Sequence, residues 1–98
     1  MIRHHALLTL NDDAKDVADT IVAELIAFGP TCPEILTYQV GRDIGATPGT
    51  ADVAVVAEFE TLDNYRVYAE HPEHLRILNE HIRPNLLSMA RVQTETRP

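Results

Sequence analysis

Residues 52–60 read DVAVVAEFE, and this stretch predicts a β-strand with apolar side chains on both of its faces. One set of alternate positions holds Val53, Val55, Ala57 and Phe59, and the other set includes Ala54 and Val56. Successive side chains of a strand point to opposite sides of the sheet, so this strand needs a cover on each side. The rest of the chain has to supply those two covers.

The segments around this strand predict the element order β-α-β-β-α-β. Further strands are expected at residues 2–10, 34–43 and 86–94, and helices at residues 14–28, 62–71 and 72–83. Gly29 is expected to be the C-terminal cap of the first helix, Pro72 to interrupt the second helix, and Pro84 to end it. This order is typical of an α+β, ferredoxin-like protomer, which has an antiparallel four-stranded sheet with both helices on one face.

Two helices on one face leave the other face of the sheet without a cover. The first strand repeats the problem, because Leu7 alternates with Ala6 and Leu8. The simplest cover is the same face of a second copy, which predicts a homodimer through the sheet face and a dimeric α/β barrel. The alternative is a monomer with a modest exposed apolar patch. In both cases residues 1–98 form a single domain.

Composition excludes several partners. The chain of 98 residues carries a net charge of -7 with a pI near 5.0, so it lacks the basic surface that nucleic acids or anionic membranes require. No stretch approaches the roughly 20 apolar residues of a membrane span, and the apolar part of residues 1–10 is too short for a signal peptide. The single Cys32 cannot form an internal disulfide, so a reducing, cytoplasmic setting is expected.

Residues 68–74 read YAEHPEH and raise the question of a metal or catalytic site. Pro72 lies between His71 and His74 at an expected helix start, so the two histidines do not form the helical i,i+3 pair that could bind a metal ion. His81 lies two helical turns beyond His74, roughly 10 Å away, which is too far to share one ion. The sequence therefore predicts no transition-metal site, and it contains no nucleotide or flavin fingerprint that would imply a cofactor. The sequence leaves open the binding of a loosely held cation by carboxylates and carbonyl groups.

Acid–base chemistry is the second interpretation of the same residues. Imidazole titrates near neutral pH and is a common general base beside a hydroxyl group. Tyr68 precedes His74 by six residues, and one of His4 and His5 must point toward the helices. The structural alternative is that His71 and Pro72 simply begin a helix.

Four stretches together resemble the stress-responsive A/B barrel (Dabb) family: MIRHHALLTL at 1–10, GRD at 41–43, VAEFE at 56–60, and YAEHPEH at 68–74 followed by HIRP at 81–84. The resemblance spans nearly the whole chain and implies a ferredoxin-like protomer in a dimeric barrel. Many members have no known function. One is a cofactor-free polyketide cyclase, olivetolic acid cyclase.

The resemblance to that cyclase implies roles for individual residues. His74 would remove a proton α to a carbonyl, and Tyr68 would donate a hydrogen bond to the developing oxyanion. His4 would line the pocket, and the remaining expected ligand-binding residues are His71, Val55 and Leu8. The chain has few aromatics and many alanines, so a long polyketide is not implied.

Three functional hypotheses follow. The first is a barrel protein of the Dabb type whose pocket binds a small apolar or aromatic ligand without catalysis. The second is a cofactor-independent cyclase or lyase that uses Tyr68 and His74. The third, which rests on similar architecture alone, is a cofactor-free monooxygenase.

Overall fold

The four strands form one antiparallel sheet, as the sequence predicts. The computed structural model describes residues 1–97, and its strand order is β2-β3-β1-β4. The strands are β1 Ile2–Leu10, β2 Thr37–Arg42, β3 Val53–Phe59 and β4 Leu86–Glu95. The helices are α1 Ala18–Phe28, α2 Leu62–Ala69 and α3 Pro72–Ile77, which continues as a π-helical turn at Leu78–Ile82. This arrangement confirms the ferredoxin-like α+β fold.

Two elements begin three or more residues later than predicted. The segment Asp12–Val17 is a 3-10 helix, so α1 is α-helical only from Ala18; the Ala14 amide bonds the Asn11 carbonyl three residues earlier, 2.9 Å away. The strand expected from residue 34 begins at Thr37. A turn closed by the Ile35 amide on the Cys32 carbonyl occupies the intervening residues.

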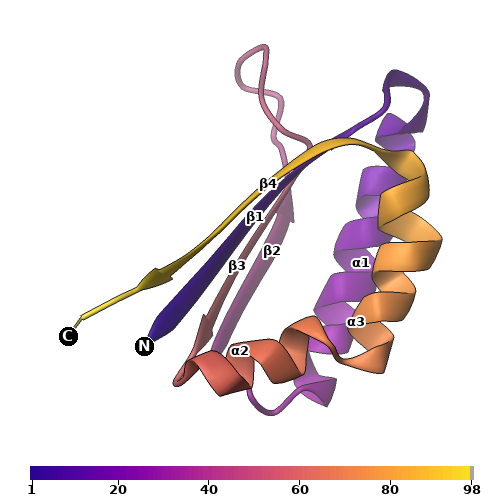
Figure 1. Cartoon of the computed structure of the whole chain (residues 1–98). Helices are drawn as coiled ribbons and strands as arrows, with labels where there is room; N and C mark the ends of the chain where they lie inside the picture. Colours follow the sequence, from indigo (N-terminus) through magenta and orange to yellow (C-terminus); the bar gives the residue numbers. More distant parts are fainter. Residues whose placement is uncertain (98) are drawn as a thin grey trace.

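All helices lie on one side of the sheet (Figure 1). On β3, the side chains at 53, 55, 57 and 59 are buried against them, and on β1 those at 4, 6, 8 and 10 are buried. Burial therefore follows the period-2 pattern of a strand. The helices contribute the other half of the core, chiefly Ile21, Leu25, Phe28, Tyr68 and Ile77.

The opposite sheet face has no cover among residues 1–97 (Figure 1). Leu7 lies between Ala54 on β3 and Ala90 on β4, and it is 47% exposed. The next pairs along β1 bring Val56 and Val92 to the two sides of His5. These residues form an apolar strip across three strands: Leu7, Ala54, Val56, Ala90 and Val92. We call this strip the open sheet face.

Gly29 is the C-cap of α1, as the sequence predicts. Its φ of -44° is right-handed helical, and it begins the 3-10 turn Gly29–Thr31. A Cβ atom at this position would lie 2.9 Å from Cδ2 of Tyr38. Glycine is needed here because the Tyr38 ring packs directly on the backbone at the end of α1. That packing brings the Tyr38 hydroxyl to Tyr68.

We expect Gly29→Ala to destabilise the protein by about 1–3 kcal/mol, the usual cost of overpacking. Urea unfolding at fixed protein concentration measures the effect. The control is the same substitution in a Tyr38→Ala background, where no ring opposes the new methyl group. There, alanine in right-handed helical backbone should be neutral or stabilising. An equal loss in both backgrounds would contradict the ring contact as the cause.

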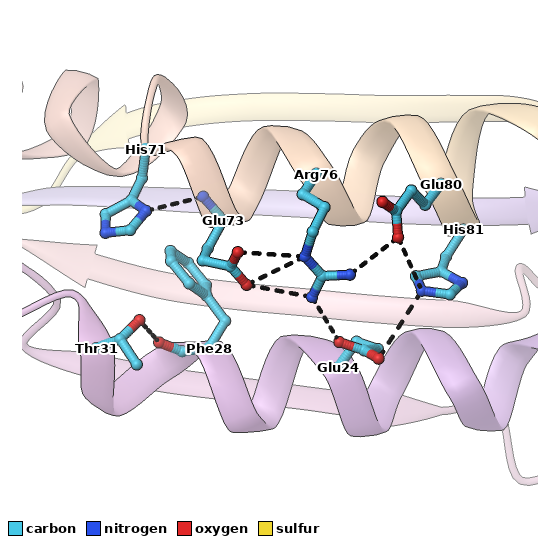
Figure 2. Close-up of polar contacts among 8 residues, drawn as sticks. All are labelled: Glu24, Phe28, Thr31, His71, Glu73, Arg76, Glu80 and His81. Atoms are coloured by element: carbon cyan, nitrogen blue, oxygen red, sulfur yellow. Dashed lines mark hydrogen bonds and ion pairs between the residues drawn. The ribbon is translucent and has the colours of Figure 1, made fainter.

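An ion cluster joins α1 to α3 on their outer surface (Figure 2). Arg76 contacts Glu24 of α1 at 2.9 Å, and on its own helical segment it contacts Glu73 and Glu80 at 3.2 and 3.0 Å. These three carboxylates raise the pKa of the Arg76 guanidinium above its usual value, mainly through hydrogen bonds, with Glu24 first. The cluster fixes α3, and with it His74, against α1.

Candidate functional site

A cavity of about 240 Å³ lies between the sheet and the helices. Its lining comes from β1, β3 and β4 on one side and from the segments 65–83 on the other. The lining residues relevant below are His4, Ala6, Leu8, Val55, Tyr65, Tyr68, His74, Leu75, Leu78, Arg83, Met89 and Arg91. Five of the six residues proposed from the sequence as catalytic or ligand-binding therefore meet at one cavity, and His71 does not.

His74 lies in the first turn of α3, and the preceding turn fixes its tautomer. Its Nδ1 atom is 3.1 Å from the Ala69 carbonyl oxygen. A carbonyl only accepts hydrogen bonds, so Nδ1 carries the proton and Nε2 keeps a lone pair. Nε2 makes no hydrogen bond to residues 1–97. Every fully buried side-chain nitrogen in that range has a hydrogen-bond partner. Nε2 is therefore not fully buried, and His74 lines the cavity. This nitrogen is accordingly accessible from the cavity.

Burial lowers the pKa of His74, and the hydrogen bond to Ala69 opposes this shift only in part. The positive charge of Arg83 contributes to the lowering. The imidazole is consequently neutral at pH 7. This is the protonation state in which a histidine can accept a proton.

Tyr68 packs beside His74, with ring centroids 4.4 Å apart. Its side chain is 2% exposed, and its hydroxyl lies 3.3 Å from the Tyr38 hydroxyl. Burial raises the pKa of Tyr68 far above its usual value and that of Tyr38 to about 12, so both phenols are protonated. Either hydroxyl is able to donate in this pair. When Tyr38 donates, the proton of Tyr68 is free for a ligand.

His4, and not His5, faces the helices, as alternation on β1 requires. The amide nitrogen of Gln93 on β4 donates to His4 Nδ1 at 2.9 Å, which leaves the ring proton on Nε2. The His4 ring lies 5.2 Å from Tyr65 and 5.9 Å from Tyr68. Burial lowers the pKa of His4 to about 4, and the nearby His74 and Arg91 add to this effect. His4 thus presents a neutral N–H to the same cavity.

His71 lies outside the cavity lining, contrary to the expectation that it binds ligand. Its Nδ1 accepts a hydrogen bond from the Glu73 amide at 3.1 Å, and it is the N-cap of α3 (Figure 2). Its ring packs edge-on against Phe28 at 5.0 Å. Pro72 follows as the first helical residue, so this part of the YAEHPEH segment serves to begin a helix.

Several lining residues were not identified from the sequence. Tyr65 lies one helical turn before Tyr68, so helical spacing was the available signal. Arg91 lies on the helix-facing positions of β4, together with Met89 and Gln93. Alternation in β4 would have grouped these three. Arg83 precedes Pro84, and the sequence assigned it only to a helix end.

The structure also bears on metals and membranes. Within residues 1–97, no group of three or more His, Cys, Asp or Glu side chains is arranged to hold a metal ion. Over the same range, no helix is both long and apolar enough to span a membrane.

Comparison with protein families assigns the chain. The model of the stress responsive A/B barrel domain, Dabb, matches residues 2–95. The chain belongs to the Dabb family. Within curated proteins, no sequence matches it.

Solved structures agree with the Dabb assignment. A dimeric ferredoxin-like protein of unknown function from Thermobifida fusca shares 34% identity at a TM-score of 0.86, covering 97% of this chain and 90% of that one. A dimeric protein of unknown function with a ferredoxin-like fold from Bacteroides fragilis shares 30% identity at 0.80, covering 97% and 95%. A hydroxynitrile lyase from Passiflora edulis shares 18% identity at 0.77, covering 99% and 96%, and shows a common fold alone.

The buried histidine of this Dabb protein makes its stability depend on pH. The unfolded chain protonates His4 below about pH 6.5, but the folded protein does so only below about 4. The unfolded state therefore binds more protons between these values, and stability falls as pH falls through this window. Between pH 7 and pH 5 we expect a loss of roughly 2 kcal/mol from this group.

Urea unfolding at a series of pH values, at fixed protein concentration, measures this loss. His4→Asn should reduce the change of the unfolding free energy with pH above pH 5, where the carboxylates contribute least to that change. His81→Asn, on the outer surface near Glu24, should change the overall stability without removing the slope. An unchanged slope in His4→Asn would contradict the assignment to His4.

Proposed function

We propose that this Dabb protein is a homodimeric, cofactor-independent enzyme of the lyase or cyclase type that removes a proton α to a carbonyl group. The observation that carries the proposal is the state of His74. Its Nδ1 proton is held by the Ala69 carbonyl, and its neutral Nε2 is open to a partly enclosed cavity. A base in this state needs no further activation to accept a proton.

The step begins when His74 Nε2 takes the α-proton. The electron pair of the C–H bond moves to the carbonyl oxygen, which becomes an enolate, and the ring becomes an imidazolium. Two donors would stabilise that oxygen: the Nε2–H of His4, and the Tyr68 hydroxyl when Tyr38 donates to it. Later, the imidazolium returns the proton to carbon, or the enolate carbon attacks a second carbonyl and the imidazolium protonates the alkoxide that forms.

Tyr68 lies between the two histidine rings, at 4.4 Å from His74 and 5.9 Å from His4. This position supports its role as a hydrogen-bond donor to the reacting group. It also keeps the two imidazoles in a fixed relative orientation, because the Tyr68 ring is buried by Phe28 and Phe59. Val55 and Leu8 form the apolar floor of the cavity.

The homodimer is proposed to form through the open sheet face. The T. fusca and B. fragilis relatives are dimeric by their descriptions. If two such faces pack together, the two sheets form the dimeric α/β barrel, and the exposed apolar strip is removed from water. The cavity lies on the other side of the sheet, so each protomer keeps its own site.

The relative from Passiflora edulis is a hydroxynitrile lyase, so lyase chemistry occurs on this fold. The proposal itself rests on the residues of this chain. A non-catalytic binding protein and a monooxygenase are outcomes of the test described next. The cytoplasmic setting expected from the single cysteine stays a prediction.

Exchange of carbon-bound hydrogen tests the proposal directly. β-Benzoylpropionate and its methyl ester each carry a methylene group next to a ketone, and a second methylene next to the carboxyl group serves as an internal reference. In deuterium oxide, the protein should accelerate loss of the proton NMR signal of the first methylene group. No acceleration with either compound would contradict the proposal, and oxygen-dependent consumption would indicate a monooxygenase.

A further inference from the structure

The charges around the cavity are opposite in sign to the charge of the chain. The protein has 15 Asp and Glu residues and only 8 Lys and Arg residues. Nevertheless, among residues 1–97, the only charged residues in the cavity lining are Arg83 and Arg91. No carboxylate of this described part of the chain lies among the lining residues. The cavity is thus a positively charged site on an acidic protein.

These two arginines also differ from the other basic residues in their partners. Arg3, Lys15, Arg42, Arg66 and Arg76 each form an ion pair with a carboxylate. Arg83 bonds instead to a neutral amide oxygen, that of Asn79 at 2.5 Å. Within residues 1–97, Arg91 has no hydrogen-bonded or ionic partner. Arg97 is the third basic residue that forms no ion pair with a carboxylate of residues 1–97.

The two guanidinium groups belong to opposite walls of the cavity. Arg91 is on β4, paired with Ala6 and two residues before Gln93, which holds His4. Arg83 follows the π-helical turn at the end of the α3 segment. Both side chains are exposed, so they lie at the rim while the histidines and Tyr68 lie deeper. A ligand in the cavity would pass between them.

We infer that the ligand of this cavity carries a carboxylate group, which Arg91 and Arg83 bind at the rim while an apolar body with a carbonyl group reaches His74. This inference rests on the proposed function and names the substrate class for it. Guanidinium groups bind carboxylates through two parallel hydrogen bonds, which gives both affinity and orientation.

The size of the cavity limits the apolar body. An apolar cavity of about 150 Å³ admits a benzene ring, and this one measures about 240 Å³. The space suits one ring with a short chain. A keto acid of one ring is therefore the expected class, and a long multi-ketide chain is not.

An anion at the rim also suits the histidines electrostatically. Arg91 is one cause of the lowered pKa of His4, and Arg83 is one cause of the lowered pKa of His74. A bound carboxylate would offset these positive charges when His74 becomes an imidazolium. The arginines would thus bind the substrate and set the charge balance in which the proton is transferred.

Calorimetric titration of β-benzoylpropionate and of its neutral methyl ester tests the inference. At low ionic strength the acid should bind at least about tenfold more tightly than the ester, as expected for charge-assisted hydrogen bonds. Arg91→Gln should reduce this preference to within about twofold, and added salt should weaken binding of the acid only. Arg66→Gln, which alters an exposed pair with Asp63 on α2, should keep the preference.

Equal affinity for acid and ester in the wild-type protein would overturn the inference, as would an unchanged preference in a folded Arg91→Gln variant. Tighter binding of phenyl phosphate than of the acid would replace the carboxylate with a phosphate and would also overturn it. The proposed function is tested separately, by measuring exchange of carbon-bound hydrogen in the neutral ester. Exchange that depends on His74 supports that function even where the acid has no advantage.

Discussion

His74→Ala is expected to slow the exchange of the ketone-adjacent protons of β-benzoylpropionate by about 10²- to 10⁴-fold, the usual contribution of a general base. The reason is that, among the cavity-lining residues of the described range 1–97, no other neutral side-chain nitrogen has a free lone pair. The Nδ1 lone pair of His4 accepts the hydrogen bond from Gln93. The measurement is the first-order loss of the proton NMR signal in deuterium oxide, relative to the internal methylene group.

A second variant separates catalysis from structure. His74→Ala also removes the donor to the Ala69 carbonyl, which connects α2 to α3. His74→Asn retains an N–H donor for that carbonyl but supplies no base. Both variants should lose exchange, whereas His74→Asn should unfold closer to the wild-type temperature. His81→Ala is the matched control, because this histidine lies outside the cavity lining.

The pH profile gives an independent check. Burial lowers the pKa of His74, so the wild-type rate should be nearly independent of pH above 7 and should fall only on the acid side, below pH 6.5. A rate that rises steadily through pH 8 would indicate hydroxide or a different base. Exchange at the wild-type rate in a folded His74→Asn protein would exclude His74 as the base.

The fold was predictable because its signals are periodic. The two-sided apolar pattern of residues 53–59 indicated both the burial against the helices and the open sheet face. The alternation of His4 and His5 predicted that one of them would face the helices. Residue periodicity reports which side of an element is buried. The boundary at Ala18 was missed because 3-10 and α-helical turns bury similar positions.

The candidate site was predictable only in part. His74 and Tyr68 were found because they lie in one short segment with an informative proline. Tyr38, Gln93 and Arg91 come from strands far away in the sequence, and only the pairing of β2 with β3 and of β1 with β3 and β4 brings them near. The role of Gly29 depends on one ring, that of Tyr38, 2.9 Å from an absent Cβ. Contacts of this kind leave no periodic signal in the sequence.

Val56→Asp is expected to convert the dimer into a monomer. Val55 is 4% exposed and lines the cavity, whereas Val56 lies on the open sheet face, through which the dimer is proposed to form. In a two-fold symmetric interface the new carboxylate is buried twice. Two buried, unpaired charges should cost at least about 4 kcal/mol, which is about a thousandfold in dissociation constant.

Light scattering after size exclusion, over a dilution series, measures the oligomeric state. Val67→Asp is the control: Val67 is 46% exposed on α2, away from the open sheet face, and should leave the dimer intact. A Val56→Asp protein with the wild-type dimer mass would exclude this face as the interface. Loss of the dimer in both variants would point to general destabilisation.

The Val56→Asp monomer also tests how the two faces of β1 depend on each other. Leu7 and His5 lie on the open sheet face, while His4, Ala6 and Leu8 alternate with them on the cavity side. The cavity lies on the side of the sheet opposite the open sheet face, so the folded monomer should still bind β-benzoylpropionate, with an affinity within a few-fold of the wild-type value. Its unfolding midpoint should fall, because the sheet face loses its cover. A folded monomer that cannot bind would show instead that the partner sheet holds β1 and β4 in the register that places His4 and Arg91.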